Sequence, residues 1–339
     1  MLVFLPNGRN RTNQRAEALH MKAVYLFAAA TVLTFPVWTL SAQESVCRTN
    51  VLVTAVDQKT NEPFDGLTAS DLRAEFKGHD LPIRSLSPPL ATRRFVFVLD
   101  RSGGMTKPDN SPGQPYNPNQ LVKRALGEAL SQMRHGDTVA FLAFTGPSST
   151  RTEFVGSGSA RAKVSEILAW QPNTQGDGRR TPLWDNIDAA LGMLSPHEIG
   201  DVIVVVTDGN DNLSKLHPGQ VQRKLLEAHV PLLAIVTANP FAPSPEERTV
   251  PADFLELIEE SGGAVAPLGS ALQSFGYRID SPLAPNQLTS QLAHQYELEV
   301  ETPPIQKPER WNLSVRTKET GKKLNLFYPR YLASCAAVQ

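Results

Sequence analysis

Strand-like and helix-like segments alternate along the chain from Arg93 onward, and this alternation constrains the fold more than any other feature. Apolar runs typical of buried strands recur between segments with helical spacing. The expected strands cover 95–100, 138–144, 202–207, 232–236 and 263–267. The expected helices cover 120–133, 160–170, 183–194, 218–228, 252–261 and 284–295. Such alternation predicts an α/β fold with a doubly wound, mostly parallel sheet and helices on both of its faces.

Shorter β segments lie before and after this region. Strands are expected at 50–56, 73–77 and 81–86, with a helical turn within 64–72 that Thr68 or Ser70 would cap. Strands are also expected at 296–301, 311–317 and 323–328. Fewer than fifty residues form only a marginal core, so we expect the two β segments to combine into one small β-sandwich. The predicted domains are 43–91 and 297–339 for the β segments and 92–296 for the α/β domain.

The first 42 residues have the layout of a secretory signal peptide. Lys22 precedes a long apolar stretch that ends in small residues at Ser41 and Ala42. We expect cleavage after Ala42, with Met21 as an alternative start, and a periplasmic or extracellular mature chain without a transmembrane span. An uncleaved anchor is the other interpretation, because residues 23–42 are about as long as a membrane span. A proline and several threonine, alanine and serine residues in that stretch weaken it.

Cysteine usage agrees with export. The sequence has two cysteines, Cys47 and Cys335, close to the two ends of the expected mature chain. The ends of compact domains are often neighbours, and disulfides persist in oxidising compartments. We therefore favour one disulfide between Cys47 and Cys335, with two unpaired buried thiols as the alternative.

Composition and motifs disfavour several functional classes. The 33 basic residues are matched by 34 acidic ones without a basic stripe, so we expect no nucleic-acid binding. The seven histidines lack the spacing of a zinc hydrolase, and there is no GxSxG elbow of a serine hydrolase. The phrase DRSGGM after the first α/β strand lacks the GxGxxG pattern of a dinucleotide enzyme. These features favour a protein that is not an enzyme.

Polar side chains follow the expected strands of the α/β region. Asp100 ends one apolar strand and Asp208 comes directly after another, Ser102 lies two residues beyond Asp100, and Thr181 precedes an expected helix. Because the carboxyl ends of parallel strands meet at one edge of a sheet, we expect these four side chains to gather. Two carboxylates and two hydroxyls form a hard oxygen site, which suits Mg²⁺ or Mn²⁺.

These residues resemble the von Willebrand factor A domain and its metal-ion-dependent adhesion site, whose pattern is Asp-x-Ser-x-Ser, then a distant Thr and a distant Asp. Four of the five positions are matched, by Asp100, Ser102, Thr181 and Asp208, in the phrases FVLDRSGGM, TPLWDNI and VIVVVTDGND. Residues 49 to about 330 resemble a bacterial family of exported proteins with such a Rossmann-like core. The resemblance implies that a glutamate or aspartate of a protein partner completes the metal's coordination.

The chain departs from the family pattern at Gly104, which replaces the second serine. The resemblance implies that this serine contacts the metal, so we expect weakened Mg²⁺ or Mn²⁺ binding, with an empty site as the alternative. We expect Arg101, Gly104 and Asp109 to lie nearest the partner, although Arg101 also fits a solvated side chain. The polar loop 106–119 fits either a recognition surface or a disordered insertion, and Asp109 or Asn110 could replace the lost ligand.

Each proposed ligand also has a structural interpretation. Asp100 and Asp208 could cap helix starts by accepting backbone N–H bonds. Thr181 fits the N-cap of the following helix, alone or together with a metal role, and Asp185 suits the first turn of that helix better than a metal. The three phrases match the adhesion-site pattern in its order along the chain, which favours a metal site, or the remnant of one, over helix caps alone.

The sequence therefore predicts an exported, non-enzymatic protein-binding module with a degenerate adhesion site. A metal-free scaffold of the cell envelope, which would bind through its loops or its β region, is the alternative. A hydrolase that uses Asp100 and Asp208 around a metal is the third hypothesis.

Overall fold

The computed structural model describes residues 46–88, 92–106, 118–170, 180–237, 249–268, 285–292, 294–316 and 323–336. The expected signal peptide, Asp109, Asn110 and most of the loop 106–119 lie outside these residues. All of the described residues belong to one compact unit, Glu44–Gln339. Among the helices that the structure describes, none is both long and apolar enough to cross a membrane.

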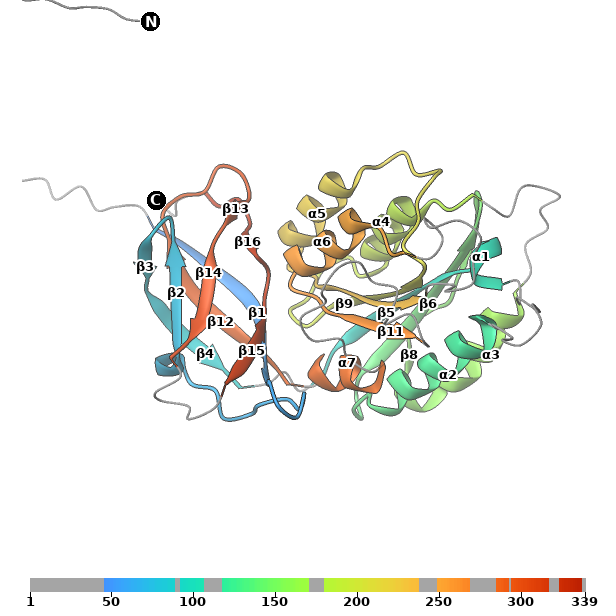
Figure 1. Cartoon of the computed structure of the whole chain (residues 1–339), viewed down its shortest axis with the longest axis horizontal. Helices are drawn as coiled ribbons and strands as arrows, with labels where there is room; N and C mark the ends of the chain where they lie inside the picture. The colour runs from blue at the N-terminus through green and yellow to red at the C-terminus, as the bar shows by residue number, and fades with distance from the viewer. Residues whose placement is uncertain are drawn as a thin grey trace, which may run out of the picture. The chain divides into compact units, whose positions relative to one another are not determined.

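One mostly parallel sheet forms the centre of the α/β core (Figure 1). Its strands run in the order β11-β10-β9-β5-β6-β7, and β8 also pairs with β6. The strands from β11 to β6 are parallel to their neighbours, whereas β7 and β8 pair with β6 in the antiparallel direction. Their bounds are Arg94–Asp100 (β5), Thr138–Thr145 (β6), Ser148–Arg151 (β7), Val155–Gly156 (β8), Val202–Thr207 (β9), Leu232–Thr237 (β10) and Val265–Leu268 (β11).

Helices cover both faces of this sheet (Figure 1). One face carries α2 (Pro118–Ser131), α3 (Ser157–Ala169) and α7 (Pro285–Leu292), and the other carries α4 (Leu183–Met193), α5 (Pro218–Glu227) and α6 (Ala252–Glu260). In β5, Phe97 packs into the first layer and Val98 into the second. A strand buried on both faces needs apolar residues at successive positions, which explains its uninterrupted apolar run. The expected doubly wound α/β fold is confirmed.

Two antiparallel sheets form a β-sandwich, with strand orders β15-β1-β12-β4 and β14-β2-β3. Strand β1 pairs with both β12 and β15, so the first and last parts of the described chain share one sheet and one apolar core, as expected. The bounds are Cys47–Asp57 (β1), Leu72–Phe76 (β2), His79–Leu81 (β3), Ile83–Ser87 (β4), Gln295–Thr302 (β12), Asn312–Val315 (β14) and Leu324–Phe327 (β15). The domain limits proposed from the sequence remain predictions.

The β region differs from expectation in its short elements. The single strand expected over 81–86 is two strands, β3 and β4, which belong to different sheets. Pro82 lies between them and has no N–H to donate to a ladder. Thr68 is the N-cap residue of a 3₁₀ turn, Ala69–Asp71, as expected, and its own N–H donates to Asp71 Oδ2 at 2.8 Å. The strands β13 (Glu309–Arg310) and β16 (Tyr331–Leu332) are too short to show an apolar–polar alternation, so the sequence does not predict them.

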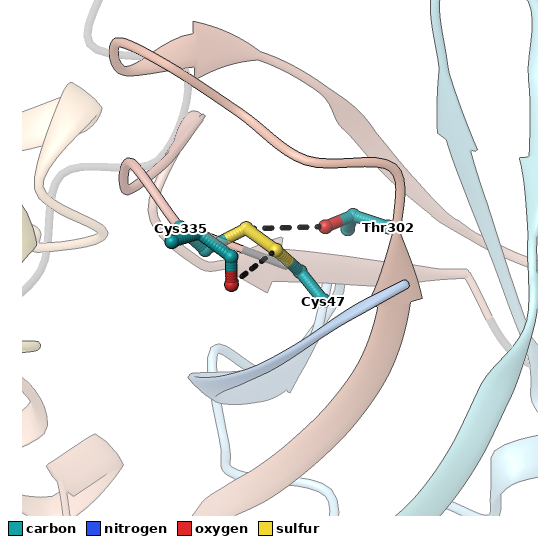
Figure 2. Close-up of a disulfide and its surroundings, with 4 residues drawn as sticks. Cys47, Thr302 and Cys335 are labelled. Atoms are coloured by element: carbon teal, nitrogen blue, oxygen red, sulfur yellow. Dashed lines mark hydrogen bonds between the residues drawn. A yellow bond between two sulfur atoms is a disulfide. The ribbon is translucent and has the colours of Figure 1, made fainter. Parts of the chain in front are cut away.

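A disulfide joins Cys47 and Cys335 (Figure 2), as favoured from the sequence. Cys47 begins β1, and the backbone of Cys335 exchanges two hydrogen bonds with that of Ile305, at 2.8 and 3.1 Å. The bridge therefore fastens the C-terminal segment to the start of β1 across a sequence separation of 288.

Removing this bridge is expected to destabilise the fold. The double variant Cys47→Ala/Cys335→Ala should lose about 2–4 kcal/mol of unfolding free energy, because a covalent link between distant residues restricts the unfolded chain. Denaturant titration of the oxidised wild type and the double variant measures the difference. Reductant should lower the wild type to the level of the variant and leave the variant unchanged. Equal midpoints for the oxidised wild type and the variant would show that the bridge does not stabilise the fold.

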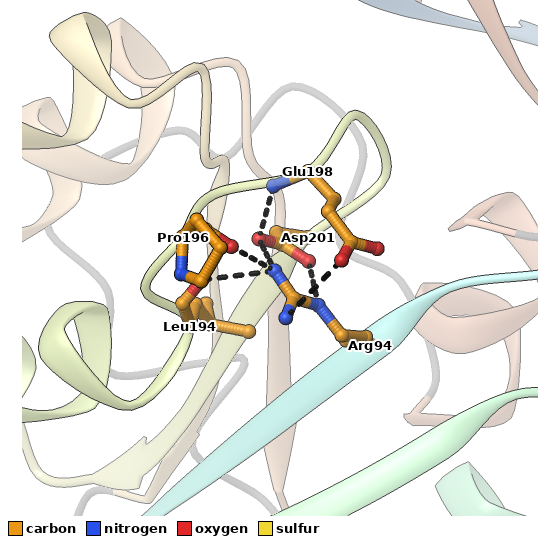
Figure 3. A network of polar contacts seen from close by, with 5 residues as sticks. All are labelled: Arg94, Leu194, Pro196, Glu198 and Asp201. Carbon is orange, nitrogen blue, oxygen red and sulfur yellow. Dashed lines mark hydrogen bonds and ion pairs between the residues drawn. The ribbon is translucent and has the colours of Figure 1, made fainter.

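An arginine network secures the sheet at the end of β5 opposite to its carboxyl end (Figure 3). The Arg94 Nε and Nη2 atoms donate to the Asp201 carboxylate at 2.7 and 2.6 Å. Nη2 also donates to the backbone oxygens of Leu194 and Pro196, and Asp201 accepts the N–H of Glu198. A two-point arginine–carboxylate pair of this kind fixes geometry as well as charge. It anchors the connection between α4 and β9, and so the start of the strand that precedes Asp208.

Candidate functional site

Asp100 ends β5 at the carboxyl edge of the sheet and is buried. Its Oδ1 accepts the backbone N–H of Ser102 at 2.8 Å, and the side chain of Ser102 bonds to the same carboxyl. Its Oδ2 accepts the hydroxyl hydrogen of Thr207 at 2.8 Å. Both oxygens of Asp100 are therefore held in a fixed orientation by groups that donate hydrogen bonds.

Asp208 lies close enough to Asp100 for their charges to interact. Burial, and then the negative charge of Asp208, raise the pKa of Asp100 to about 7. Burial disfavours a charged carboxylate, and a second carboxylate nearby disfavours it further. Asp208 itself follows β9, and its Oδ1 accepts the N–H of Asn210 at 3.0 Å. The structure thus brings together Asp100, Ser102 and Asp208, three of the four residues expected to bind a metal.

Thr181, the fourth expected ligand, is buried and joined to the loop that follows Asp208. Its N–H donates to Asn212 Oδ1 at 2.7 Å, and its carbonyl oxygen accepts the N–H of Asn212 at 3.1 Å. The segment that carries Thr181 and the loop after Asp208 are therefore held side by side. The N-cap of α4 is Pro182, without a side-chain cap bond, so the hypothesis that Thr181 caps this helix is wrong.

Further side chains of the same loop bind the start of α4. Asp211 Oδ2 accepts the N–H of Trp184 at 3.2 Å, and the Ser214 hydroxyl accepts the N–H of Asp185 at 3.1 Å. The Asp185 carboxylate accepts the backbone N–H groups of the two residues that follow Ser214, at 3.0 to 3.1 Å. Asp185 therefore anchors this loop as well as lying in the first turn of its own helix.

Sequence reasoning did not identify Asp211, Asn212 or Ser214. A signal for them exists, because the phrase DGNDNLS places short polar side chains at nearly every position after the β9 strand. Asp, Asn and Ser side chains bond readily to nearby backbone groups and so order loops of this kind. The pattern indicates an ordered loop but not which backbone groups it binds.

Arg101 is turned toward α3. Its Nη1 donates to the carbonyl oxygen of Leu168 in the last turn of α3 at 2.7 Å, and its Nε is buried. Burial lowers the pKa of Arg101 below its ordinary value. The expectation of a solvated side chain is wrong, because a guanidinium at a helix C-terminus binds the free carbonyl groups there. Gly104 lies in the short helix α1, Gly103–Thr106, which begins two residues after Arg101.

The donors gathered at this edge fit a small hard cation. Within the described residues, no three His, Cys, Asp or Glu side chains group together, so the donor set is two carboxylates with neighbouring hydroxyls. Mg²⁺ and Mn²⁺ prefer oxygen ligands, and Mg²⁺ usually retains several waters. The buried carboxylate of Asp100, next to the negative charge of Asp208, would gain directly from such a cation.

Comparison with known proteins finds similarity to solved structures. No protein-family model and no curated protein matches the chain. An aerotolerance-related membrane protein from Bacteroides fragilis is 16% identical, with a TM-score of 0.43, over 59% of this chain and 98% of that chain. The ArnB paralog VWA2 from Sulfolobus acidocaldarius is 13% identical, with a TM-score of 0.39, over 84% of this chain and 76% of that chain.

A third similar structure is proximal thread matrix protein 1 from the mussel byssus, with a zinc-occupied MIDAS motif. It is 17% identical, with a TM-score of 0.43, and the match covers 62% of this chain and 48% of that chain. The chain thus matches about half the length of that protein. The names of these two proteins, the VWA2 paralog and the matrix protein with a MIDAS motif, are those of structures to which the chain is similar at TM-scores below 0.5.

Proposed function

We propose that this chain is a protein-binding module that uses a divalent cation at the carboxyl edge of its α/β sheet. Asp100, Ser102, Thr181 and Asp208 would hold Mg²⁺ or Mn²⁺, and an acidic side chain of a partner protein would complete the coordination. The observation that carries this proposal is the buried Asp100, oriented by Ser102 and Thr207 beside a second carboxylate. Buried carboxylates are costly unless they are compensated, and a cation compensates them.

Under this proposal, the residues of the chain bind the cation and orient its carboxylate ligands. The cation, when bound, supplies the positive charge that attracts a partner's carboxylate. Ser102 and Thr207 donate to Asp100 and fix its plane, and Asn212 ties the segment of Thr181 to the loop after Asp208.

We further propose that the protein acts outside the cytoplasm, in the periplasm or extracellularly. The signal-peptide layout of the first 42 residues supports export. The Cys47–Cys335 disulfide supports it independently, because such bridges persist in oxidising compartments.

A metal-free scaffold of the cell envelope is a second candidate, and Gly104 is the observation that favours it. Gly104 occupies the position of the second serine of the adhesion-site pattern, so the chain lacks one hydroxyl in α1. Under that hypothesis the carboxylate pair is a relic, and partners bind through the loops or the β-sandwich.

The Gly104→Ser variant separates the two candidates. Restoring a hydroxyl at this position is expected to tighten Mg²⁺ binding by roughly tenfold, about the free energy of one added polar contact. Calorimetric titration of the purified chain measures the change. Gly103→Ser, one residue earlier in the same helix, is the matched control and should bind as the wild type does. No gain for Gly104→Ser over Gly103→Ser would favour the scaffold.

A pull-down tests the partner. The full chain, immobilised, is incubated with an envelope extract in Mg²⁺ and then washed with a chelator. The proposal predicts retained proteins that the chelator releases and that Asp208→Ala fails to retain. Proteins that stay bound in chelator and bind Asp208→Ala equally well would contradict metal-dependent recognition.

A further inference from the structure

Thr207 connects the two carboxylate-bearing segments of the site. It ends β9 and is completely buried. Its hydroxyl donates to Asp100 Oδ2 at 2.8 Å and accepts the backbone N–H of Gly209 at 3.0 Å. A hydroxyl has one hydrogen, and since Gly209 supplies the second bond, that hydrogen is committed to Asp100.

The sheet register places Thr207 for this task. Strands β5 and β9 are parallel neighbours in which Leu99 pairs with Val206, so the next residues, Asp100 and Thr207, lie level at the sheet edge. Gly209 has a φ of +86°, which a residue with a side chain rarely adopts, and a Cβ there would lie 2.9 Å from Phe254. The backbone of the turn after Asp208 is therefore restricted to one conformation, in which the hydroxyl of Thr207 accepts the N–H of Gly209.

We propose that Thr207 is a positioning residue for cation binding at this site. It acts through Asp100 and through the turn after Asp208, and it keeps the two carboxylates in a fixed relation while the cation enters. This inference rests on the function proposed above. Valine has nearly the shape of threonine but neither donates nor accepts, whereas serine keeps the hydroxyl, so the two substitutions separate shape from hydrogen bonding.

Mg²⁺ titration of the full chain tests this role. Thr207→Val is expected to weaken Mg²⁺ binding by roughly tenfold to a hundredfold, the effect of losing a hydrogen bond to a charged group. Thr207→Ser should stay within about threefold of the wild type. The matched control is Thr237→Val, at the end of neighbouring β10, where the hydroxyl bonds to the Met105 sulfur at 2.9 Å instead of a carboxylate. This control should bind Mg²⁺ as the wild type does.

Two outcomes would overturn the proposal. Unchanged affinity in Thr207→Val would show that the hydroxyl is dispensable, and equal losses in Thr207→Val and Thr207→Ser would show that only packing matters. Thermal melts confirm that each variant is folded, and Thr207→Ala repeats the test if the valine variant melts early. If the wild type binds no Mg²⁺, the proposed function itself is refuted. If the wild type and Thr207→Val bind Mg²⁺ with the same affinity, only the role of Thr207 is refuted.

Discussion

Replacing Asp100 with asparagine is expected to stabilise the metal-free protein at pH 8 and to abolish Mg²⁺ binding. The pKa of Asp100 is raised from 3.8 to about 7 by burial and by the charge of Asp208. At about 1.36 kcal/mol for each pKa unit, holding this group ionised in the fold costs about 4 kcal/mol. Asparagine carries no charge but forfeits about one hydrogen bond, so the expected net gain is about 2–3 kcal/mol.

The gain should depend on pH in a defined direction. Because the folded pKa is raised, the protonated carboxyl stabilises the fold fully below pH 3.8, and this contribution is lost as the pH rises through about 7. The metal-free wild type should therefore lose stability between pH 4 and pH 8 relative to Asp100→Asn. Near pH 4 the wild type should be the more stable of the two by about 1–2 kcal/mol, because asparagine forfeits a hydrogen bond and no ionisation cost opposes that loss.

Denaturant titrations in chelator at pH 4, 6 and 8 measure this difference. Asp80→Asn is the control, because Asp80 is an exposed carboxylate on β3 that pairs with Arg73. This control should follow the wild type at every pH. An Asp100→Asn protein that is less stable than the wild type at pH 8 would show that the carboxylate is not held at a cost in stability.

Replacing Asp137 with alanine is expected to cost about 3–5 kcal/mol of unfolding free energy, because it would leave the charge of Arg93 buried without its partner. The Arg93 Nη2 and Asp137 Oδ2 atoms lie 3.1 Å apart, and the two side chains are 1% and 0% exposed. Asp137 also accepts the backbone N–H groups of Arg93 and Arg134, at 3.0 and 2.8 Å. Burial already lowers the pKa of Arg93 below its ordinary value.

Two further variants make this test specific. Asp80→Ala breaks the exposed pair with Arg73 and should cost less than about 1 kcal/mol. The double variant Arg93→Met/Asp137→Ala removes both charges and should recover part of the loss, because the uncompensated charge is gone. Chemical denaturation measures all three. If Asp137→Ala costs no more than Asp80→Ala, the buried pair does not hold the start of β5 in place.

The core strands could be predicted closely from the sequence because each is buried on both faces. The strand expected at 202–207 matches β9, Val202–Thr207, and that at 95–100 differs from β5 by one residue. Such strands need continuous apolar runs, which stand out from their surroundings. The strands of the β-sandwich are harder to predict from the sequence. Strands β3 and β4 are short, and the chain passes from one sheet to the other between them, at Pro82, which an apolar–polar alternation does not reveal.

Some residues of the site could likewise be predicted from the sequence and others could not. Asp100, Ser102 and Asp208 could be predicted because parallel strands bring their carboxyl ends to one edge. Thr207 and Asn212 could not, because a threonine or asparagine beside a strand end is common and only the tertiary pairing shows what it binds. The contact of Arg101 could not be predicted, because its partner, the carbonyl oxygen of Leu168, lies 67 positions along the chain.

Calorimetric titration of the purified full chain with Mg²⁺ at pH 8, beside Asp208→Ala, tests the metal-binding claim most directly. We predict a saturable heat with one ion per chain in the wild type, reversal by chelator, and no heat in Asp208→Ala. A wild type that gives no heat beyond dilution, or a wild type and Asp208→Ala that bind alike, would contradict a cation site at this edge of the sheet.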